Sequence, residues 1–302
     1  MKVRIGILGM LLWLCVMPIT AGGRAERLKG GKVERQRGGE AERLAPEREA
    51  QFYYDFYAAQ KAINEGHYAQ AYCLLHLCAE INPKDARTQD YLGIIYDALH
   101  QKDSARAFFA RAYEQAPNEL YQHHVSALME TGQYKQALQI MKQATKANAD
   151  DVDAWNMLLQ VAMTNADYTT AAKAIDEVEK HLGPSPYSSL VRYRIAISKE
   201  NIKKAFVYLD EYLEQVPDNP TILNDYAYLL ATHKGDLKKA EQMSAKAIQL
   251  QPNNASFLDT YGWILHLQGQ DALAQFYLNK ALNLSTDGNE KMIITQHLEK
   301  VK

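Results

Sequence analysis

The 302-residue sequence lacks most of the features that mark an enzyme or a nucleic-acid-binding protein. It has no His-Glu-x-x-His metal motif, no glycine-rich phosphate loop and no Gly-x-Ser-x-Gly nucleophile elbow. Its formal net charge of −2 gives no reason to propose nucleic acid as a partner. The alternation of apolar and polar residues that is typical of β-strands is also missing. These absences argue against catalysis and favour a helical protein that binds other molecules.

Cysteine is scarce, with three residues in the whole chain. Cys73 and Cys78 lie five residues apart on one expected helix, where disulfide geometry would require distortion. We interpret both as packing residues. His76 lies between them, but this spacing fits no common zinc pattern. His123 and His124 are helical neighbours that point about 100° apart, which is poor geometry for chelating one ion. We therefore predict no metal site and no cofactor.

The strongest positive feature is an internal repeat. The second repeat, for example, carries Leu92-Gly93, Tyr96, Ala105, Phe109, Ala112 and Pro117. Self-similarity with a period near 34 residues is the signature of a helical repeat array. The repeats are marked by alanines at intervals of 32 to 35 residues: Ala71, Ala105, Ala137, Ala171, Ala205, Ala240 and Ala274.

On these residues the chain resembles the tetratricopeptide-repeat family, over roughly residues 52–284. The resemblance implies an all-α fold, a right-handed superhelical solenoid of about seven antiparallel helix pairs. We place the array at residues 51–284 and a C-terminal capping helix at 285–302. Gly93 and Gly262 are expected to let paired helices approach closely. The fifth repeat is the most degenerate, because Arg192-Tyr193 stands where Leu-Gly is expected.

The N-terminus has the pattern of a secretory signal peptide over residues 1–23. Lys2 and Arg4 precede an apolar run from Ile5 to Ile19, and small residues follow. We therefore expect export to a bacterial periplasm. Two alternatives keep the chain at a membrane, namely an uncleaved anchor or lipidation of Cys15. Residues 24–50 are rich in charge and poor in apolar groups, so we expect a flexible spacer.

The resemblance also implies where a ligand would bind. In this family the second, fifth, ninth, twelfth and thirteenth residues of each first helix line a concave groove. Ile222 and Leu229 are also assigned to these positions. The principal groove residues that the resemblance implies are Phe56, Gln60, Asn64, Asp90, Asp97, Gln122, Asn156, Gln160, Tyr187, Arg194, Asp225 and Trp263.

The composition of this predicted groove suits a polypeptide ligand. Its N-terminal half is rich in amides and carboxylates, whereas its C-terminal half is more apolar and aromatic. The first interpretation is a non-catalytic scaffold that binds a peptide segment or a partner helix, within a complex of the bacterial cell envelope. The alternative is a glycan-binding accessory subunit of a polysaccharide-export or envelope-assembly system. Trp155, Tyr187 and Trp263 would then stack on sugars.

Overall fold

The computed structural model describes residues 45–233 and 235–301, which contain fifteen α-helices and no strand. The predicted all-α repeat fold is confirmed. By contacts between backbone positions, these residues divide into two compact units that meet in sequence between Pro217 and Asp218. The first unit contains α1 (Pro46–Asn64), α2 (Tyr68–Ile81), α3 (Ala86–Ala98), α4 (Lys102–Gln115), α5 (Gln122–Glu130), α6 (Tyr134–Ala147), α7 (Val152–Thr164), α8 (Tyr168–Leu182), α9 (Pro186–Ser198) and α10 (Ile202–Gln215).

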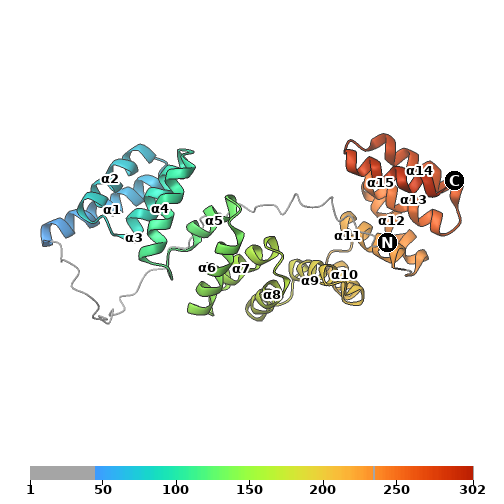
Figure 1. Ribbon diagram of the computed structural model, residues 1–302, viewed down its shortest axis with the longest axis horizontal. Helices are drawn as coiled ribbons and strands as arrows, with labels where there is room; N and C mark the ends of the chain where they lie inside the picture. The colour runs from blue at the N-terminus through green and yellow to red at the C-terminus, as the bar shows by residue number, and fades with distance from the viewer. Residues whose placement is uncertain (1–44, 234, 302) are drawn as a thin grey trace. The chain divides into compact units, whose positions relative to one another are not determined.

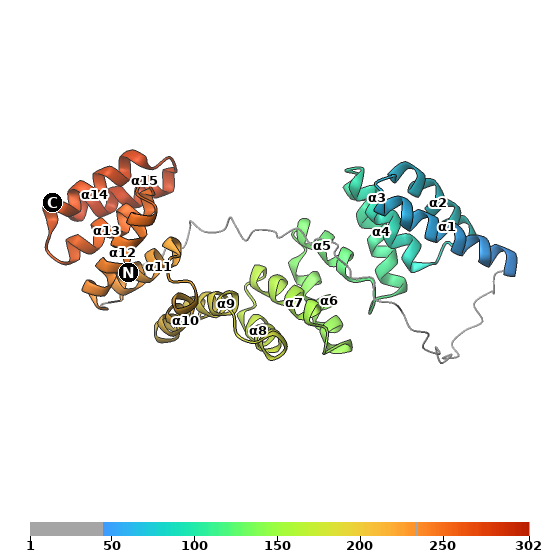
Figure 2. The ribbon, with the colours of Figure 1, turned by 180° about the vertical axis from the view of Figure 1, so that it is seen from behind.

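Consecutive helices pair within each unit, α1 with α2, α3 with α4 and so on, and each pair also contacts the next pair of its unit (Figures 1 and 2). We call the first and second helices of a pair the A and B helices. A final single helix, α15, packs against both members of the last pair. The second unit contains α11 (Pro220–Thr232), α12 (Leu237–Leu250), α13 (Ala255–Leu267), α14 (Asp271–Leu284) and α15 (Gly288–Lys300).

The A helices begin at side-chain caps that recur with the repeat. The Asp85 carboxylate accepts a hydrogen bond from the backbone N–H of Thr88 at 2.8 Å, and Asp151 accepts one from Ala154 at 3.0 Å. Such a cap satisfies one of the free amides at a helix start. α1 and α5 are the exceptions, because Ala45 and Tyr121 precede them without a side-chain cap. The caps that share this role are Asp85, Asp151, Ser185, Asn219 and Asn254.

In six helix pairs, the turn between the A helix and its B helix contains a residue in the left-handed conformation. Gly66, Gly132 and Gly269 lie in three of these turns, and their φ angles are between 75° and 79°. In three other helix pairs the residue at this position of the turn is not glycine, although its φ angle is also positive. The residues concerned are His100, Ala166 and Glu200, with φ of 59°, 54° and 54°.

The alanines of the repeat form the core between paired helices, and all seven are at most 1% exposed. Gly93 and Gly262 lie on A helices directly against residues of their B helices. A Cβ atom at Gly93 would lie 2.4 Å from the ring of Phe109, and one at Gly262 would lie 2.8 Å from Leu278. The predicted role of both glycines in close packing is therefore confirmed.

Two expectations are wrong in detail. α1 begins at Pro46, so the predicted spacer cannot extend to residue 50. Proline suits the first turn of a helix, and Glu47 and Glu49 complement the positive end of the helix dipole there. Cys78 is buried as predicted, but Cys73 is exposed and does not pack.

The C-terminal helix covers the last pair. Its Ile294 is fully buried, and it joins a cluster with Leu265 and Leu278. Among the described residues, no helix is both long enough and apolar enough to cross a membrane. The predicted signal peptide lies outside the described residues.

Candidate functional site

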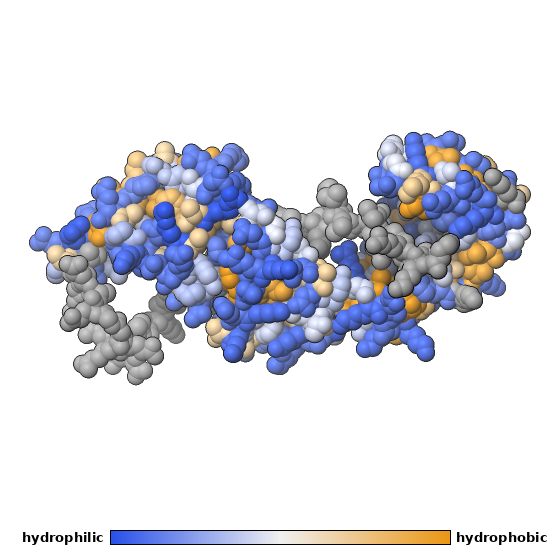
Figure 3. All heavy atoms as spheres, viewed as in Figure 1, coloured by the Kyte–Doolittle hydropathy of each residue, from blue (hydrophilic) through white to orange (hydrophobic). Residues whose placement is uncertain are grey.

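The A helices carry the residues that the resemblance assigns to ligand binding. We call these residues the A-helix wall, defined as positions 2, 5, 9, 12 and 13 of the thirteen-residue A-helix motif. This motif begins at Phe52 within the longer α1 and at Asn118, before the shorter α5. In the first unit the wall consists of residues from α1, α3, α5, α7 and α9, and in the second unit from α11 and α13. Figure 3 shows that the visible surface of both units is mostly hydrophilic, with apolar residues in small patches.

A set of polar wall residues is open to solvent in the first unit. Asn64, Gln122 and Gln160 are exposed, and Asn156 is half-buried. Within the described ranges, the side-chain amides of Asn64, Asn156 and Gln160 have no hydrogen-bonding partner. An amide offers both donors and an acceptor, so these groups can pair with the backbone of an extended chain.

Phe56 does not belong to the accessible wall. Its side chain is only 2% exposed, and its ring meets that of Tyr91 on α3 edge-on at 5.5 Å. The Arg87 guanidinium lies 5.2 Å from the ring centroid. Gln60 is half-buried and donates to the Tyr91 hydroxyl at 2.8 Å. These two residues join α1 to α3, so the prediction that Phe56 faces a ligand is wrong.

Asp90 is also engaged, by a histidine of the next A helix. His123 Nδ1 on α5 lies 2.9 and 3.0 Å from the two carboxylate oxygens of Asp90, which is 6% exposed. The imidazole also stacks on Phe109 at 5.0 Å. The hydrogen bond to Asp90 raises the pKa of His123, and it outweighs burial, which lowers that pKa. The predicted wall residue Asp90 therefore fastens α3 to α5.

The same arrangement recurs in the second unit. His297 Nδ1 on α15 lies 2.8 Å from the Asp259 carboxylate on α13, and both residues are buried. The His297 ring stacks on Trp263 at 4.5 Å, and the Lys300 ammonium lies 4.9 Å from the same indole. Trp263 is at its predicted position, but it supports α15 and is half-buried. We call the Asp90–His123 and Asp259–His297 pairs the aspartate–histidine clamps.

The predicted register of α11 is wrong by one residue. Counting from its cap, Asn219, places Asn224 fifth and Tyr228 ninth, whereas Asp225 is sixth. The burial of the side chains supports this corrected register. Ile222 and Leu229, which are predicted to line the groove, are only 4% and 6% exposed, whereas Tyr228 is 41% exposed. The cause is an extra residue between α11 and α12, where the interval between repeat alanines is 35. An assignment that assumes the usual spacing between the two helices of a pair is therefore displaced by one residue in α11.

A cavity of about 100 Å³ lies among α3, α4 and α5, beside the wall. α5 has nine residues where most other A helices have thirteen, and this pair is two residues shorter than the family period. Lys102 Nζ lies 2.7 Å from Asp97 and 3.5 Å from Glu130. The hydrogen bond to Asp97 raises the pKa of Lys102. The residues that line this cavity are Asp97, Lys102, Ala105, Arg106, Phe109, His123, Ser126, Ala127 and Glu130.

The aromatic platforms proposed for sugar stacking are mostly unavailable. Trp155 is 6% exposed, and its indole N–H donates to the carbonyl of Ala149 at 2.8 Å. Trp263 lies under α15. Tyr187, 46% exposed, is accessible, and Arg194 on the same helix is half-buried. Burial of part of its ring raises the pKa of Tyr187.

Several contacts within the wall were not predicted from the sequence. His123 and His297 were not assigned to it, and their partners lie 33 and 38 residues away. In the degenerate fifth repeat, Arg192 replaces the expected leucine and binds Glu179 and Asp176 of α8. These ion pairs join α9 to α8, the B helix of the preceding pair.

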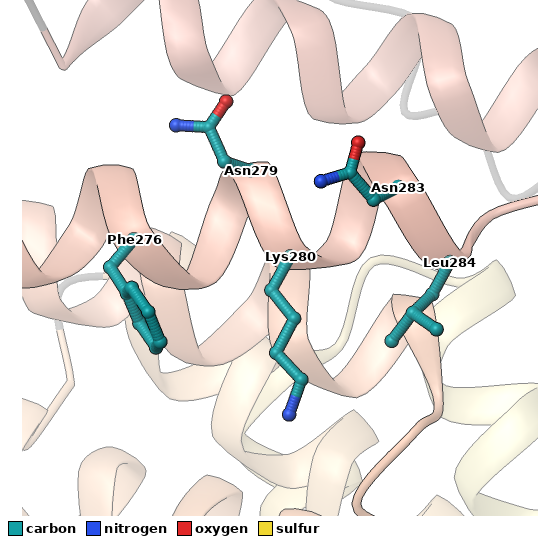
Figure 4. A pocket seen from close by; sticks show the side chains of 5 residues that line it. All are labelled: Phe276, Asn279, Lys280, Asn283 and Leu284. Atoms are coloured by element: carbon teal, nitrogen blue, oxygen red, sulfur yellow. The ribbon is translucent and has the colours of Figure 1, made fainter.

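Other concave features are less suited to a ligand. A depression of about 440 Å³ lies along the surface of α14. Figure 4 shows Phe276, Lys280 and Leu284 pointing to one side of this helix, and Asn279 and Asn283 to the other. In the described part of the chain, no three His, Cys, Asp or Glu side chains are arranged to hold a metal ion. Burial raises the pKa of Cys78 to about 12, so this thiol stays protonated and unreactive.

Comparisons with known proteins agree with the fold. The sequence profile described as tetratricopeptide repeat matches residues 124–188. No sequence relative was found among functionally curated proteins.

Solved structures extend the likeness beyond that segment. The C-terminal part of a tetratricopeptide-repeat protein from Cytophaga hutchinsonii has a TM-score of 0.60 at 15% identity, over 79% of this chain and 98% of that chain. A tetratricopeptide-repeat protein from Parabacteroides merdae has a TM-score of 0.52 at 14% identity, over 83% and 99%. YrrB, described as having an unusual peptide-binding site, has a TM-score of 0.50 at 17% identity, over 62% and 97%.

The helix pairs and the similar solved structures show a repeat fold of the tetratricopeptide type, and the family profile itself matches residues 124–188. The similarity to solved structures shows the fold alone, because their sequence identities are low.

Proposed function

We propose that this protein is a non-catalytic interaction scaffold whose first unit binds an extended polypeptide along the A-helix wall. The observation that carries the proposal is the set of accessible amides at Asn64, Asn156 and Gln160, which have no partners in the described structure. The description of YrrB as a peptide-binding relative in fold is consistent with this proposal.

The chemistry of the wall favours polypeptide over sugar. A peptide backbone presents alternating donors and acceptors, which side-chain amides match. Sugar binding would call for open aromatic faces, and Tyr187 alone among the three suggested platforms is exposed.

Site-specific photocrosslinking tests the proposal. A benzophenone amino acid replaces Gln160 on α7, or the exposed Lys203 on α10 as a control on a B helix. After irradiation in the native host, we expect Gln160 to give a crosslink to a polypeptide that mass spectrometry can identify. Crosslinks of equal yield from Lys203, or none from Gln160, would argue against the wall as the binding surface.

The identified segment then allows a quantitative test. The double variant Asn156→Ala/Gln160→Ala should weaken binding by about tenfold, because two hydrogen bonds of about 1 kcal/mol or less each are lost. Lys203→Ala should leave affinity unchanged. Titration calorimetry measures both, and circular dichroism checks that helicity is preserved.

The proposed place of action is the bacterial cell envelope. The basic, apolar and small-residue pattern of residues 1–23 supports export. N-terminal sequencing of protein from the native host should find a start between Ala21 and Glu26. An intact Met1, or a lipid on Cys15, would contradict release as a soluble periplasmic protein.

A further inference from the structure

The first helix leaves exposed a face that its counterparts bury. The third and tenth residues of α3, α7, α9, α11 and α13 are buried. In α1 the equivalent residues are Tyr54, 72% exposed, and Lys61, whose side chain is 76% exposed. Tyr57 beside them is 61% exposed. Buried residues at the third position include Thr88, Ala154, Ser188 and Phe257. Buried residues at the tenth position include Ile95, Val161, Ile195 and Ile264.

α1 is also longer than the other A helices, with 19 residues against a usual 13. The additional residues are at its start, which projects beyond α2 and α3 in both ribbon views (Figures 1 and 2). They extend the exposed face by almost two turns and add the exposed Glu47. Two turns of helix span about 7 residues, so Glu47, Tyr54 and Lys61 lie on one side of α1.

This face is symmetric about its central tyrosine. Glu47 and Lys61 lie seven residues before and after Tyr54, and Ala50 and Ala58 lie four residues before and after it. When two such helices lie antiparallel with the tyrosines at the centre, each Glu47 meets the Lys61 of the other copy. The small alanines face each other and allow close approach. Like charges would meet in a parallel arrangement.

We propose that the protein forms a two-fold symmetric dimer through antiparallel contact of α1 with α1 of a second copy. The charge pattern favours a second copy over an unrelated partner, because one face supplies both halves of each ion pair. Such an isologous contact closes on itself and produces a dimer, not a filament. Lys61 lies 3.9 Å from Glu65 of its own helix, but both are solvent-exposed, so Lys61 can change partner.

The contact is small, and this sets the expected strength. One helix from each copy buries less than the roughly 800 Å² per partner found in stable complexes. We therefore expect a reversible dimer with a dissociation constant of about micromolar or weaker. Tyr54 and Tyr57 supply the central aromatic area, and the ion pairs at the rim set the antiparallel orientation.

Charge reversal tests the orientation. Glu47→Lys and Lys61→Glu each convert two attractions into two repulsions, and each should raise the dissociation constant at least tenfold in sedimentation velocity. An equimolar mixture of the two variants should dimerise again, because every contact then joins a lysine to a glutamate. The double variant Glu47→Lys/Lys61→Glu should also dimerise. The matched controls Glu214→Lys and Lys203→Glu on α10 should behave like the parent protein.

The outcomes separate the possible occupants of this face. Dimerisation that weakens in each single variant and returns in the mixture supports the proposal. A parent protein that stays monomeric across the concentration range overturns it, as would happen if residues 1–44 or a lipid surface covered α1. A dimer that persists in both single variants places the interface elsewhere and also overturns it. Circular dichroism confirms that these exposed substitutions leave the fold intact.

Discussion

At the scale of single residues, the turns between paired helices hold strain that the glycines avoid. Ala166 has φ of 54°, a left-handed conformation that costs a residue with a side chain roughly 1–2 kcal/mol. Ala166→Gly removes this cost, although glycine adds freedom to the unfolded chain worth about 0.4–1 kcal/mol. We expect a net gain of about 0.5–1 kcal/mol in the free energy of unfolding, measured with urea.

The reverse substitution provides the control. Gly132 has φ of 75°, and a Cβ atom there would meet nothing within 4 Å. Gly132→Ala should therefore destabilise by about 1 kcal/mol through backbone strain alone. If both variants shifted stability in the same direction, backbone conformation would not be the cause.

A second prediction concerns close packing. Gly93→Ala places a methyl group 2.4 Å from the Phe109 ring and should cost about 1–3 kcal/mol of unfolding free energy. Gly288 lies at a helix start, and a Cβ atom there meets nothing within 4 Å, so Gly288→Ala serves as the matched control. Phe109→Leu should partly rescue Gly93→Ala in a double-mutant cycle. Equal stability of Gly93→Ala and the parent would mean that α3 and α4 are further apart than described.

At the scale of helices, the aspartate–histidine clamp between α3 and α5 makes stability depend on pH. Asp90 raises the pKa of His123 above the ordinary value of about 6.5. Protonated His123 therefore favours the folded state. Its contribution is complete below the unfolded pKa and disappears as the pH rises through the higher folded pKa. His123→Gln should lower the thermal midpoint in mild acid and change it little in alkaline buffer.

His124 should behave in the opposite way. It stacks on Tyr113 at 5.0 Å, and burial lowers its pKa. Protonation of His124 therefore favours unfolding, and His124→Gln should raise the thermal midpoint as the pH falls. Two neighbouring histidines with opposite effects would distinguish the clamp from a general effect of net charge. If the thermal midpoints of both variants changed with pH in the same direction relative to the parent protein, the proposed effect of the clamp on stability would be contradicted.

The helix pairs could be predicted from the sequence, but much of the site could not. The alanine column, Gly93 and the turn glycines fix the pairs because they act within about 34 residues. The predicted register of α11 is wrong because the repeat pattern does not show on which side of the α11–α12 turn the extra residue lies. The engagement of Asp90 by His123 depends on contacts between successive repeats, which one repeat's pattern does not contain. Whether the A-helix wall binds a ligand stays a prediction.

At the scale of the whole molecule, stability is expected to be local. A repeat array is held by contacts between neighbouring pairs, so its parts can unfold separately. The two compact units have separate hydrophobic clusters, including one around Leu159 and Ile175 and one around Leu258 and Ile294. Hydrogen exchange at increasing urea should show peptides from 46–215 and from 220–300 losing protection at different concentrations. Loss at one common concentration with one slope would indicate a single cooperative unit.

The short α5 has a further consequence for any extended chain lying on the wall. A perfectly periodic wall offers several equivalent registers, each displaced by one repeat, and a ligand could slide between them. The cavity beside α5 breaks that translational equivalence at one point. A bulky or charged side chain seated there would select one register among many. The shortening of this repeat by two residues would then fix the position at which an extended ligand binds along the wall.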